Sequence, residues 1–392
     1  MRLDALRADL DALRDRLRSA AGDADLAHLR RVERTGWAMS ILGWATAWIA
    51  VNPISMLLIS TGIFARWTMI GHHVVHRGYD RVPGVPPRLT SRVFARGLRR
   101  WFDWPDWMDP DGWRYEHNAL HHFRLGESAD PDQPELNTQL LRNRRVPFAV
   151  RAAVFAALAA TWKFSYYAPN TLRALRNAGP DKAVPVAFPS ARMWLPWRQP
   201  GTSVWLRCYL PYALLHYGLL PLPFLALGAH AWAFAVLNRL GAEVLTNLHA
   251  FIIIVPNHVG EDIYRFETKA EQPGEFYLRQ IVGTANYRTG GFWNDFMHGY
   301  LNYQIEHHLF PDMTMRQYEL AQPEVERICR AHGVPYVQHS VWKRLVMLFD
   351  VATGRTKMRV WEEEAGDPPH GERARWDGMP GRGIDVAHSS RA

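Results

Sequence analysis

The sequence is poor in cysteine and in lysine. Its 392 residues include two cysteines, Cys208 and Cys329, which form no CxxC motif and are too few for a disulfide framework. The first residues are charged and lack an apolar stretch, so we expect no cleaved signal peptide. Only five of the 46 basic residues are lysine, so arginine supplies nearly all of a formal net charge of +8. Such an excess is typical of proteins that bind nucleic acid or that face anionic lipid.

Long apolar segments favour the membrane, rather than nucleic acid, as the surface that this charge faces. We predict four membrane-spanning helices in two hairpins, at residues 37–51, 54–70, 205–228 and 231–256. The first two segments are short against the roughly 20 residues that a spanning helix needs, so a buried soluble hairpin is an alternative for them. Residues 147–168 are also apolar, but arginines on both sides would keep both ends on one side of the membrane. We therefore expect this segment to lie at the interface.

The remaining segments are expected outside the bilayer. Residues 1–34 should form an amphipathic helix, because leucines recur there at alternating spacings of three and four. This helix would pack on the rest of the chain, on the interface, or on a second copy. Residues 35–360 should form one membrane domain, with a helical cytoplasmic cap over 258–360. Residues 361–392 are charged and rich in glycine and proline, which predicts a disordered tail.

The distribution of arginine predicts the topology. From Arg77 to Arg100 the chain has seven arginines and one aspartate, a bias that holds a loop on the cytoplasmic side. The turn at 228–231, between the last two predicted spans, carries no formal charge, as expected of an outer turn. We therefore expect an all-α, multi-pass integral membrane protein whose two termini and cap are cytoplasmic.

The fourth predicted span contains ionisable residues. Arg239, Glu243 and Asn247 recur at a spacing of four, which places them on one face of the helix. Charges within a membrane are costly and usually face protein, so we interpret Arg239 and Glu243 as a structural ion pair between helices. A role at a substrate channel is the alternative.

Histidines gather in three clusters, all on the predicted cytoplasmic side. The clusters follow the patterns HxxxH, HxxxHH and QxxHH, and their histidines are His72, His76, His117, His121, His122, His307 and His308. On a helix, a spacing of four residues presents His72 and His76 to one ion. His117 and His121 repeat that spacing, with His122 a step round the helix. Pro311 should end the third helix just after its histidine pair.

Seven imidazoles exceed the four ligands of a structural zinc ion. They fit two transition-metal ions in a nitrogen-rich cage, because neutral imidazole is the commonest metal ligand. Next to lipid, iron is the natural candidate, since activated O2 can attack unactivated C–H bonds. The clusters therefore predict two Fe ions, with O2 as co-substrate.

In this order, and around two helical hairpins, the three motifs resemble those of the membrane fatty acid desaturase superfamily. The resemblance covers roughly residues 37–345 and is most specific at 117–132 and 292–311. It implies a histidine-ligated di-iron centre that uses O2 and two electrons to introduce a double bond into a fatty acyl chain. Gln304, where many members have histidine, resembles the front-end and sphingolipid branch.

The resemblance also implies partners. The substrate would be an acyl lipid, an acyl-CoA or an acyl-carrier conjugate, met among membrane lipids. The His-Pro-Gly-Gly motif of a fused cytochrome b5 domain does not occur in the sequence, so electrons are expected from a separate ferredoxin or cytochrome b5-like donor.

The resemblance further suggests a ligand near the end of the fourth span, where His249 and His258 are the candidates. Nine residues of helix are about 13.5 Å long and turn His249 to roughly the opposite face, inside the bilayer. We therefore predict His258 as the eighth metal ligand. As neighbours that support the ligands without coordinating metal, we predict Gln304, His73 and His298.

Two other functions fit parts of the pattern. The same cage would serve a membrane di-iron hydroxylase of alkanes, carotenoids or other lipids, whose product gains an oxygen instead of losing two hydrogens. A metal transporter would instead carry its ligands on broken helices at mid-membrane, whereas these clusters lie outside the predicted spans. Asp130 and Asp132, in the acidic turn after the second cluster, fit a turn as well as a functional role.

Overall fold

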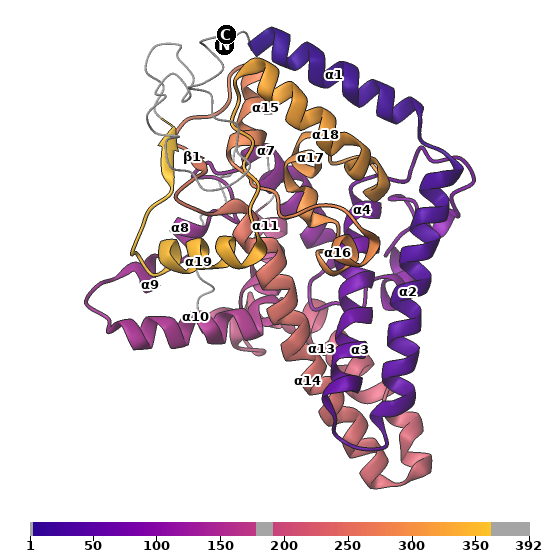
Figure 1. Cartoon of the computed structure of the whole chain (residues 1–392). Coiled ribbons are helices and arrows are strands. Elements are labelled where there is room, and N and C mark those ends of the chain that lie inside the picture. Colours follow the sequence, from indigo (N-terminus) through magenta and orange to yellow (C-terminus); the bar gives the residue numbers. More distant parts are fainter. Residues whose placement is uncertain (1–2, 178–190, 362–392) are drawn as a thin grey trace.

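The chain folds mostly into helices, and the computed structural model describes residues 3–177 and 191–361 (Figure 1). The α-helices before the gap are α1 (Leu3–Ser19), α2 (Asp23–Ala47), α3 (Pro53–Phe64), α4 (His72–Val75), α5 (Arg100–Asp103), α6 (Pro110–Trp113), α7 (His122–Arg124), α8 (Pro134–Asn137), α9 (Gln139–Arg142), α10 (Phe148–Trp162) and α11 (Ala168–Arg176). Those after it are α12 (Gly201–Val204), α13 (Leu210–Ala213), α14 (Ala229–Ile254), α15 (Pro273–Val282), α16 (Phe292–Met297), α17 (Gln304–Leu309), α18 (Met315–His332) and α19 (Val341–Ala352).

Shorter segments join or extend these helices. The π-helical segments are η1 (Ala65–Gly71), η4 (Arg114–His121), η5 (Lys163–Tyr167), η7 (Trp205–Tyr209) and η8 (Leu214–Leu219). The 3-10 segments are η2 (Pro87–Leu89), η3 (Gly97–Arg99), η6 (Ala191–Trp194), η9 (Leu222–Leu227), η10 (Val255–His258) and η11 (Leu301–Tyr303). Strands β1 (Tyr264–Phe266) and β2 (Arg359–Trp361) form a parallel pair with Tyr264 opposite Arg359.

Four continuous helical stretches are long and apolar enough to cross a membrane: Pro53–Val75, Phe148–Arg176, Gly201–Leu227 and Ala229–His258. Three of them overlap predicted spans. The stretch Phe148–Arg176 contains the segment predicted to lie at the interface, and its first helix, α10, runs across the line of α14 (Figure 1). The first predicted span, 37–51, forms the second half of α2, which ends at Ala47 and is not one of the four stretches.

α2 and α3 form a hairpin, and α14 packs against α3 (Figure 1). The turn of the hairpin ends at Asn52, whose side chain accepts a hydrogen bond from the Ser55 N–H (2.8 Å) and so caps α3. Gly62 lets the two helices approach closely, because a Cβ there would lie 2.9 Å from the Ser40 nitrogen. Small residues at such crossings are typical of helices that pair within a membrane.

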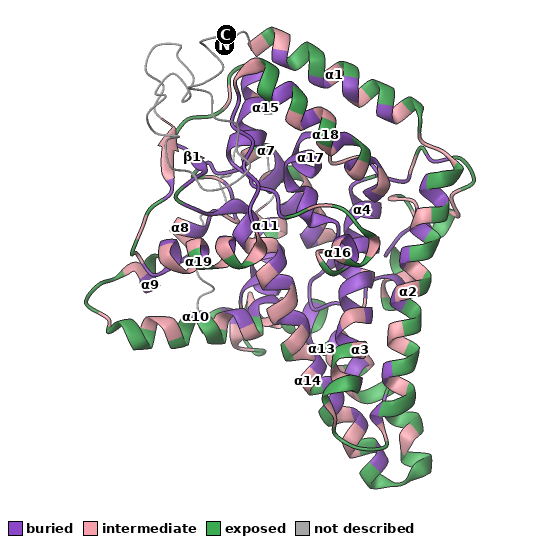
Figure 2. Cartoon of the chain, viewed as in Figure 1, coloured by how far each residue is buried: buried purple, intermediate pink, exposed green. Residues whose placement is uncertain are grey.

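Apolar side chains face outward at the narrow end of the molecule. The exposed ones include Ile41, Leu42, Ile49, Val51, Ile54, Leu57, Leu219, Leu222, Leu225, Leu227, Leu237 and Leu240. Exposed residues cover the lower ends of α2, α3 and α14 (Figure 2). So large an apolar surface is not expected in water and fits a membrane protein.

The N-terminal segment forms two helices instead of the single helix predicted over 1–34. α1 ends at Ser19 and α2 begins at Asp23, so the second half of the predicted helix leads into the membrane hairpin. The leucine seam of α1 is buried and packs on α15 and α18. The predicted tail lies outside the described residues, apart from Trp361.

The predicted ion pair of the fourth span forms within one helix. Arg239 Nη2 and Glu243 Oε2 lie 2.8 Å apart on α14, so the prediction of a pair between two helices is wrong. The Glu243 carboxylate also accepts hydrogen bonds from Trp107 Nε1 (2.7 Å) and from the Tyr212 hydroxyl. Arg239 also donates to the Tyr212 hydroxyl and to His216 Nδ1 (3.2 Å). Both members of the pair therefore link α14 to the helical stretch 201–227, and the carboxylate also links it to the loop before α6.

Candidate metal centre

The structure places the histidines of the sequence motifs, together with His258, on or beside five helical elements. His72 begins α4 and His76 follows it, His117 and His121 lie on η4, His122 begins α7, His258 ends η10, and His307 and His308 lie on α17. As predicted, α17 ends at Leu309, because Pro311 disfavours helix at the residue before it.

The eight histidines come together in two groups. Within each group, one nitrogen of every ring lies within 4.8 Å of those of the other rings. The five-histidine group consists of His72, His76, His117, His122 and His307. The three-histidine group consists of His121, His258 and His308. The rings of His122 and His308 stack with centroids 4.3 Å apart, so the two groups adjoin.

The histidines of the second motif, HxxxHH, divide between the two groups, and this division differs from the predicted pairing. His117 was expected to share an ion with His121, but it groups with His122, and the Nε2 atoms of His117 and His122 are 3.3 Å apart. The cause is the π-helical turn of η4, in which residue i pairs with i+5. His121 turns towards the rings of His258 and His308, whose centroids lie 4.8 and 5.1 Å from its own.

Many of the ring nitrogens have no hydrogen-bond partner within the part of the chain that the structure describes. They are His76 Nε2, His117 Nδ1, His122 Nδ1, His258 Nδ1, His307 Nε2 and His308 Nε2. Leaving a buried polar atom unpaired costs roughly 1–3 kcal/mol. A metal ion coordinates such nitrogens, so the residues present fit a metal centre.

Burial and the neighbouring rings lower the pKa values of these imidazoles. Desolvation, followed by repulsion from the other histidines, holds the pKa well below 6.5 for His76, His117, His122, His307 and His308. These rings are therefore neutral at pH 7, which is the state in which imidazole binds a metal.

Two carboxyl groups lie beside His117. Glu116 and Asp132 each place an oxygen within 4.8 Å of a ring nitrogen of His117. Burial, and then the Asp132 charge, raise the pKa of Glu116 well above 4.5, and burial raises the pKa of Asp132 to about 6. Burial and mutual repulsion therefore both oppose ionisation of the two carboxyl groups together. The sequence did not indicate that Glu116 lies beside Asp132 and the His117 ring.

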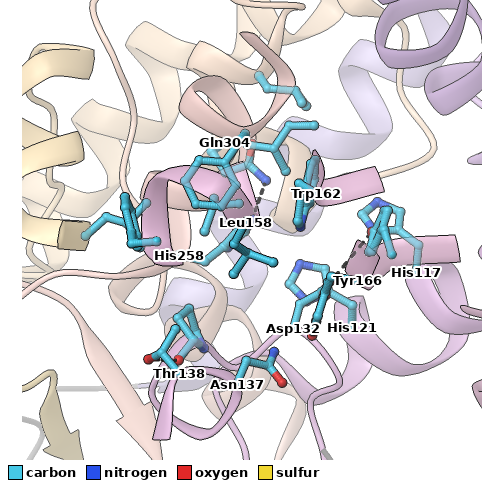
Figure 3. Close-up of a pocket in the computed structure, with 18 of the residues that line it drawn as sticks. His117, His121, Asp132, Asn137, Thr138, Leu158, Trp162, Tyr166, His258 and Gln304 are labelled. Atoms are coloured by element: carbon cyan, nitrogen blue, oxygen red, sulfur yellow. Dashed lines mark hydrogen bonds between the residues drawn. The ribbon is translucent and has the colours of Figure 1, made fainter. Parts of the chain in front are cut away.

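A narrow cavity of about 80 Å³ ends at the histidines. Figure 3 shows His117, His121, His258 and Gln304 around it, together with Leu158 and Trp162. Much of the remaining wall is apolar and includes Phe155, Phe251, Ile254 and Leu348 from α10, α14 and α19. Asp132, Asn137 and Thr138 add polar side chains to the lining. The apolar part of this lining suits a hydrocarbon chain that approaches the imidazoles.

The sequence matches the fatty acid desaturase family over residues 43–340. The chain belongs to this family. It is therefore an oxidoreductase, the family predicted from the histidine motifs is confirmed, and the transporter alternative loses its support.

Relatives of this desaturase carry names from several branches of the family. A NADPH-dependent stearoyl-CoA 9-desaturase of Mycobacterium tuberculosis is 22% identical over 375 residues, which cover 88% of this chain and 80% of the relative. An acyl-lipid (9-3)-desaturase of Physcomitrium patens is 34% identical over 99 residues, which cover 25% of this chain and 18% of the relative. The Delta(5) fatty acid desaturase fat-4 of Caenorhabditis elegans is 34% identical over 104 residues, 26% of this chain and 22% of the relative.

Three further side chains of the desaturase hold histidines of the two groups in place. His121 Nδ1 lies 3.0 Å from Asp130 Oδ1, His307 Nδ1 lies 3.2 Å from the Tyr318 hydroxyl, and His308 Nδ1 lies 3.0 Å from Gln280 Oε1. Each contact orients the ring so that its other nitrogen faces the group. Gln280 and Tyr318 were not identified from the sequence, because they lie on α15 and α18 and no local pattern connects them to the histidines.

Asp130 also affects the pKa of His121. Burial lowers the pKa of His121, but the nearby Asp130 carboxylate outweighs burial, and the net shift is upward. Both side chains are 2% exposed, so solvent screens this contact little. The acidic turn thus has a defined contact with the metal centre in addition to its turn conformation.

Replacing Asp130 with asparagine is expected to weaken metal binding by roughly 10- to 100-fold, because an amide no longer stabilises the orientation and basicity of His121. Chelator competition on the purified desaturase measures this affinity. Glu127→Gln is the matched control, since Glu127 lies in the same turn and contacts Arg124. Equal affinities of Asp130→Asn and the unchanged chain would contradict the role given to Asp130.

The other predicted neighbours differ in their distance from the centre. Gln304 Nε2 lies 3.1 Å from His258 Nε2, beside the three-histidine group. His73 lies next to His72, with ring centroids 5.0 Å apart, and its Nδ1 bonds to the Met69 carbonyl (2.7 Å). His298 is not brought to the centre: its Nδ1 bonds to the Asn294 carbonyl (2.7 Å) and its ring packs on Tyr287.

Proposed function

We propose that this protein is an O2-dependent membrane desaturase that introduces a double bond into a fatty acyl chain. Two iron ions would be held by the histidines, one in each group, and a separate protein would supply the electrons. The observation that carries this proposal is the narrow apolar cavity that ends at two adjoining groups of buried imidazoles.

Each histidine group has a defined part in this proposal. The five-histidine group would hold one iron, and the three-histidine group, with the Gln304 amide beside it, would hold the other. When bound, the pair of irons supplies the activation of O2 that removal of hydrogen from an unactivated C–H bond requires. The overall reaction takes two hydrogens from the chain, with two electrons and two protons from outside, and reduces O2 to two waters.

The polypeptide itself binds and aligns the substrate. Phe155, Leu158 and Trp162 on α10 offer an apolar wall that excludes water and holds an extended chain. Fixing one carbon–carbon bond of that chain against the histidines would set the position of the double bond. The names of the relatives support an acyl-CoA or an acyl lipid as substrate, and an acyl-carrier conjugate is a third candidate from the sequence.

We further propose that the metal centre and both termini are cytoplasmic. The hairpin of α2 and α3 and the hairpin of 201–227 with α14 would cross the membrane. α10 would lie at its cytoplasmic surface, which its course across α14 supports (Figure 1). The arginine-rich segment 77–100 suits this side of the membrane and an acidic ferredoxin or cytochrome b5-like donor.

The test of the proposal is a lipid analysis of cells that express the protein. We expect new acyl chains that are two hydrogens lighter than their precursors, and none in cells that express a His307→Ala variant. Products that instead gain one oxygen would establish a hydroxylase and refute desaturation. The mass difference of the product decides between the two reactions without knowledge of the electron donor.

A further inference from the structure

A second cavity, which we call the lateral cavity, lies outside the metal centre. It has a volume of about 1050 Å³ and lies between α2, η1, the segment 88–105 and the η8–η9 region. Its lining contains none of the eight grouped histidines. Trp104, whose two neighbours line the cavity, packs on Trp113 (5.3 Å between centroids), and Trp113 packs on His72 (5.3 Å). The two indoles thus stand between this cavity and the metal centre.

One end of the lateral cavity is apolar and open at the side. Its walls are Ile41 and Trp44 of α2 and Leu215, Leu219 and Phe224 of the η8–η9 region. Ile41 is 62% exposed and Leu219 is 60% exposed, so this end opens onto the apolar outer surface of the narrow part of the molecule. The stacked rings of Trp44 and Phe224, 6.2 Å apart, close its lower limit.

The other end of the lateral cavity is basic. Four arginines line it, and two of these are already neutralised. Arg88 forms two hydrogen bonds to Glu33 (2.6 and 2.9 Å), and Arg99 forms two to Asp103 (2.8 and 2.9 Å). The remaining two arginines, Arg34 and Arg66, leave this end with an excess of positive charge.

Neither Arg34 nor Arg66 has a carboxylate partner within residues 3–177 and 191–361. Arg34 Nε donates to the Arg30 carbonyl (3.3 Å) on its own helix. Arg66 lies over the ring of Trp37 (4.3 Å) and donates to the Phe102 carbonyl. Guanidinium groups at the edge of an apolar cavity are suited to a phosphate, whose oxygens accept several of their N–H groups at once.

The length of the lateral cavity matches one leaflet of a bilayer. Arg34 and Trp44 are ten residues apart on α2, which corresponds to about 15 Å along the helix axis. The hydrocarbon core of a bilayer is about 30 Å thick, so half of it is also about 15 Å. A molecule with a phosphate at Arg34 and Arg66 and a hydrocarbon chain reaching Trp44 would fill the cavity from a single leaflet.

We propose that the lateral cavity binds one anionic phospholipid, with its phosphate between Arg34 and Arg66 and an acyl chain along Ile41 and Leu219. This lipid would be a bound component of the protein and not its substrate, because the indoles of Trp104 and Trp113 separate it from the histidines. The inference goes beyond the proposed function and does not depend on it.

The experiment counts lipids on the purified full-length chain by native mass spectrometry, after incubation with phosphatidylglycerol and phosphatidylcholine. We expect one retained phosphatidylglycerol per chain, preferred over phosphatidylcholine by roughly tenfold, because the choline cation of phosphatidylcholine offsets the phosphate charge that attracts the two arginines. The double variant Arg34→Gln/Arg66→Gln should lose this preference. Arg145→Gln, which changes an exposed arginine outside the cavity, should keep it.

A second variant tests the apolar end of the lateral cavity. It keeps the proposal testable if the double arginine variant does not fold. Leu219→Trp adds bulk to an exposed position of the cavity wall and should lower retention of both lipids, with helix content by circular dichroism unchanged. Equal retention by the unchanged chain and Leu219→Trp, or equal binding of the two lipids, would overturn the proposal. So would a dimer that Leu219→Trp dissociates, because a second copy would then occupy the cavity. None of these readouts uses desaturase activity, so the result is independent of the proposed function.

Discussion

Replacing His307 with alanine is expected to remove metal and product together. The His307 ring is fully buried in the five-histidine group, with centroids 4.7 Å from His72, 4.9 Å from His76 and 4.7 Å from His122. Its Nδ1 is held by the Tyr318 hydroxyl, so its Nε2, which has no partner in the described chain, faces the other rings. The position therefore combines a fixed orientation with an unused ligand atom.

The size of the effect follows from the role of the atom lost. Removing a side chain that only supports a ligand costs about 10- to 100-fold in metal affinity or activity, so removing a ligand itself should cost more than about 100-fold. We expect the purified chain to hold about two iron ions, one for each histidine group, and the variant to hold fewer. Elemental analysis and product detection in the same preparation measure both quantities.

Two variants separate coordination from folding in this experiment. His307→Gln keeps most of the buried volume while removing the imidazole, so it should lose metal without the cavity that alanine leaves. His298→Ala makes the same histidine-to-alanine change outside both groups and should retain metal and product. A fully active His307→Ala variant would falsify the assignment of the five-histidine group as a metal site.

The sequence predicted those features that depend on local spacing. Pro311 ends α17 after its histidine pair, and the four-residue spacing places His72 beside His76, with ring centroids 4.9 Å apart. His258 was separated from His249 by helical geometry alone, and the structure brings His258, not His249, into a histidine group. In each case the relative placement of the residues is set by fewer than three turns of backbone.

Features that depend on the form of the helix, or on distant segments, could not be predicted. The π-helical turn of η4 moves His122 next to His117, whereas α-helical spacing pairs His117 with His121. A π-turn has no sequence signature of its own and is stabilised by its surroundings at functional sites. Similarly, α18 begins at Met315, with Thr314 as its cap, and continues through Pro323, although proline is commonest in the first turn of a helix.

The contacts that orient the histidines also depend on which segments pack together, and local sequence patterns do not predict this. Gln280 reaches His308 across 28 residues of sequence, and Asp130 reaches His121 across nine. The first contact requires the packing of α15 on α17, which no local pattern encodes. The Asp130 side of the second contact lies in the acidic turn that was identified from the sequence. The sequence does not indicate which carboxylate of that turn faces a histidine ring.

The second large effect is expected at His258, where alanine should lower iron content and abolish turnover. His258 belongs to the smaller group, with ring centroids 4.8 Å from His121 and 4.9 Å from His308. Two histidines would remain after its loss, and Gln304 beside it is an amide, which is a weaker ligand than imidazole for iron. Because fewer ligands would share a metal ion here, each one should contribute a larger part of the affinity than in the five-histidine group.

His249 provides the matched comparison, because it lies on the same helical stretch and is also a partly buried histidine. Its Nε2 already bonds to the Met297 carbonyl (2.7 Å) and its ring stacks on Phe64 with centroids 3.9 Å apart. Neither contact involves the histidine groups, so His249→Ala should lose packing but retain iron and turnover. Iron content, measured on both variants after purification at the same pH, distinguishes the two positions. Loss of iron from His249→Ala together with its retention in His258→Ala would assign the eighth ligand to the other histidine.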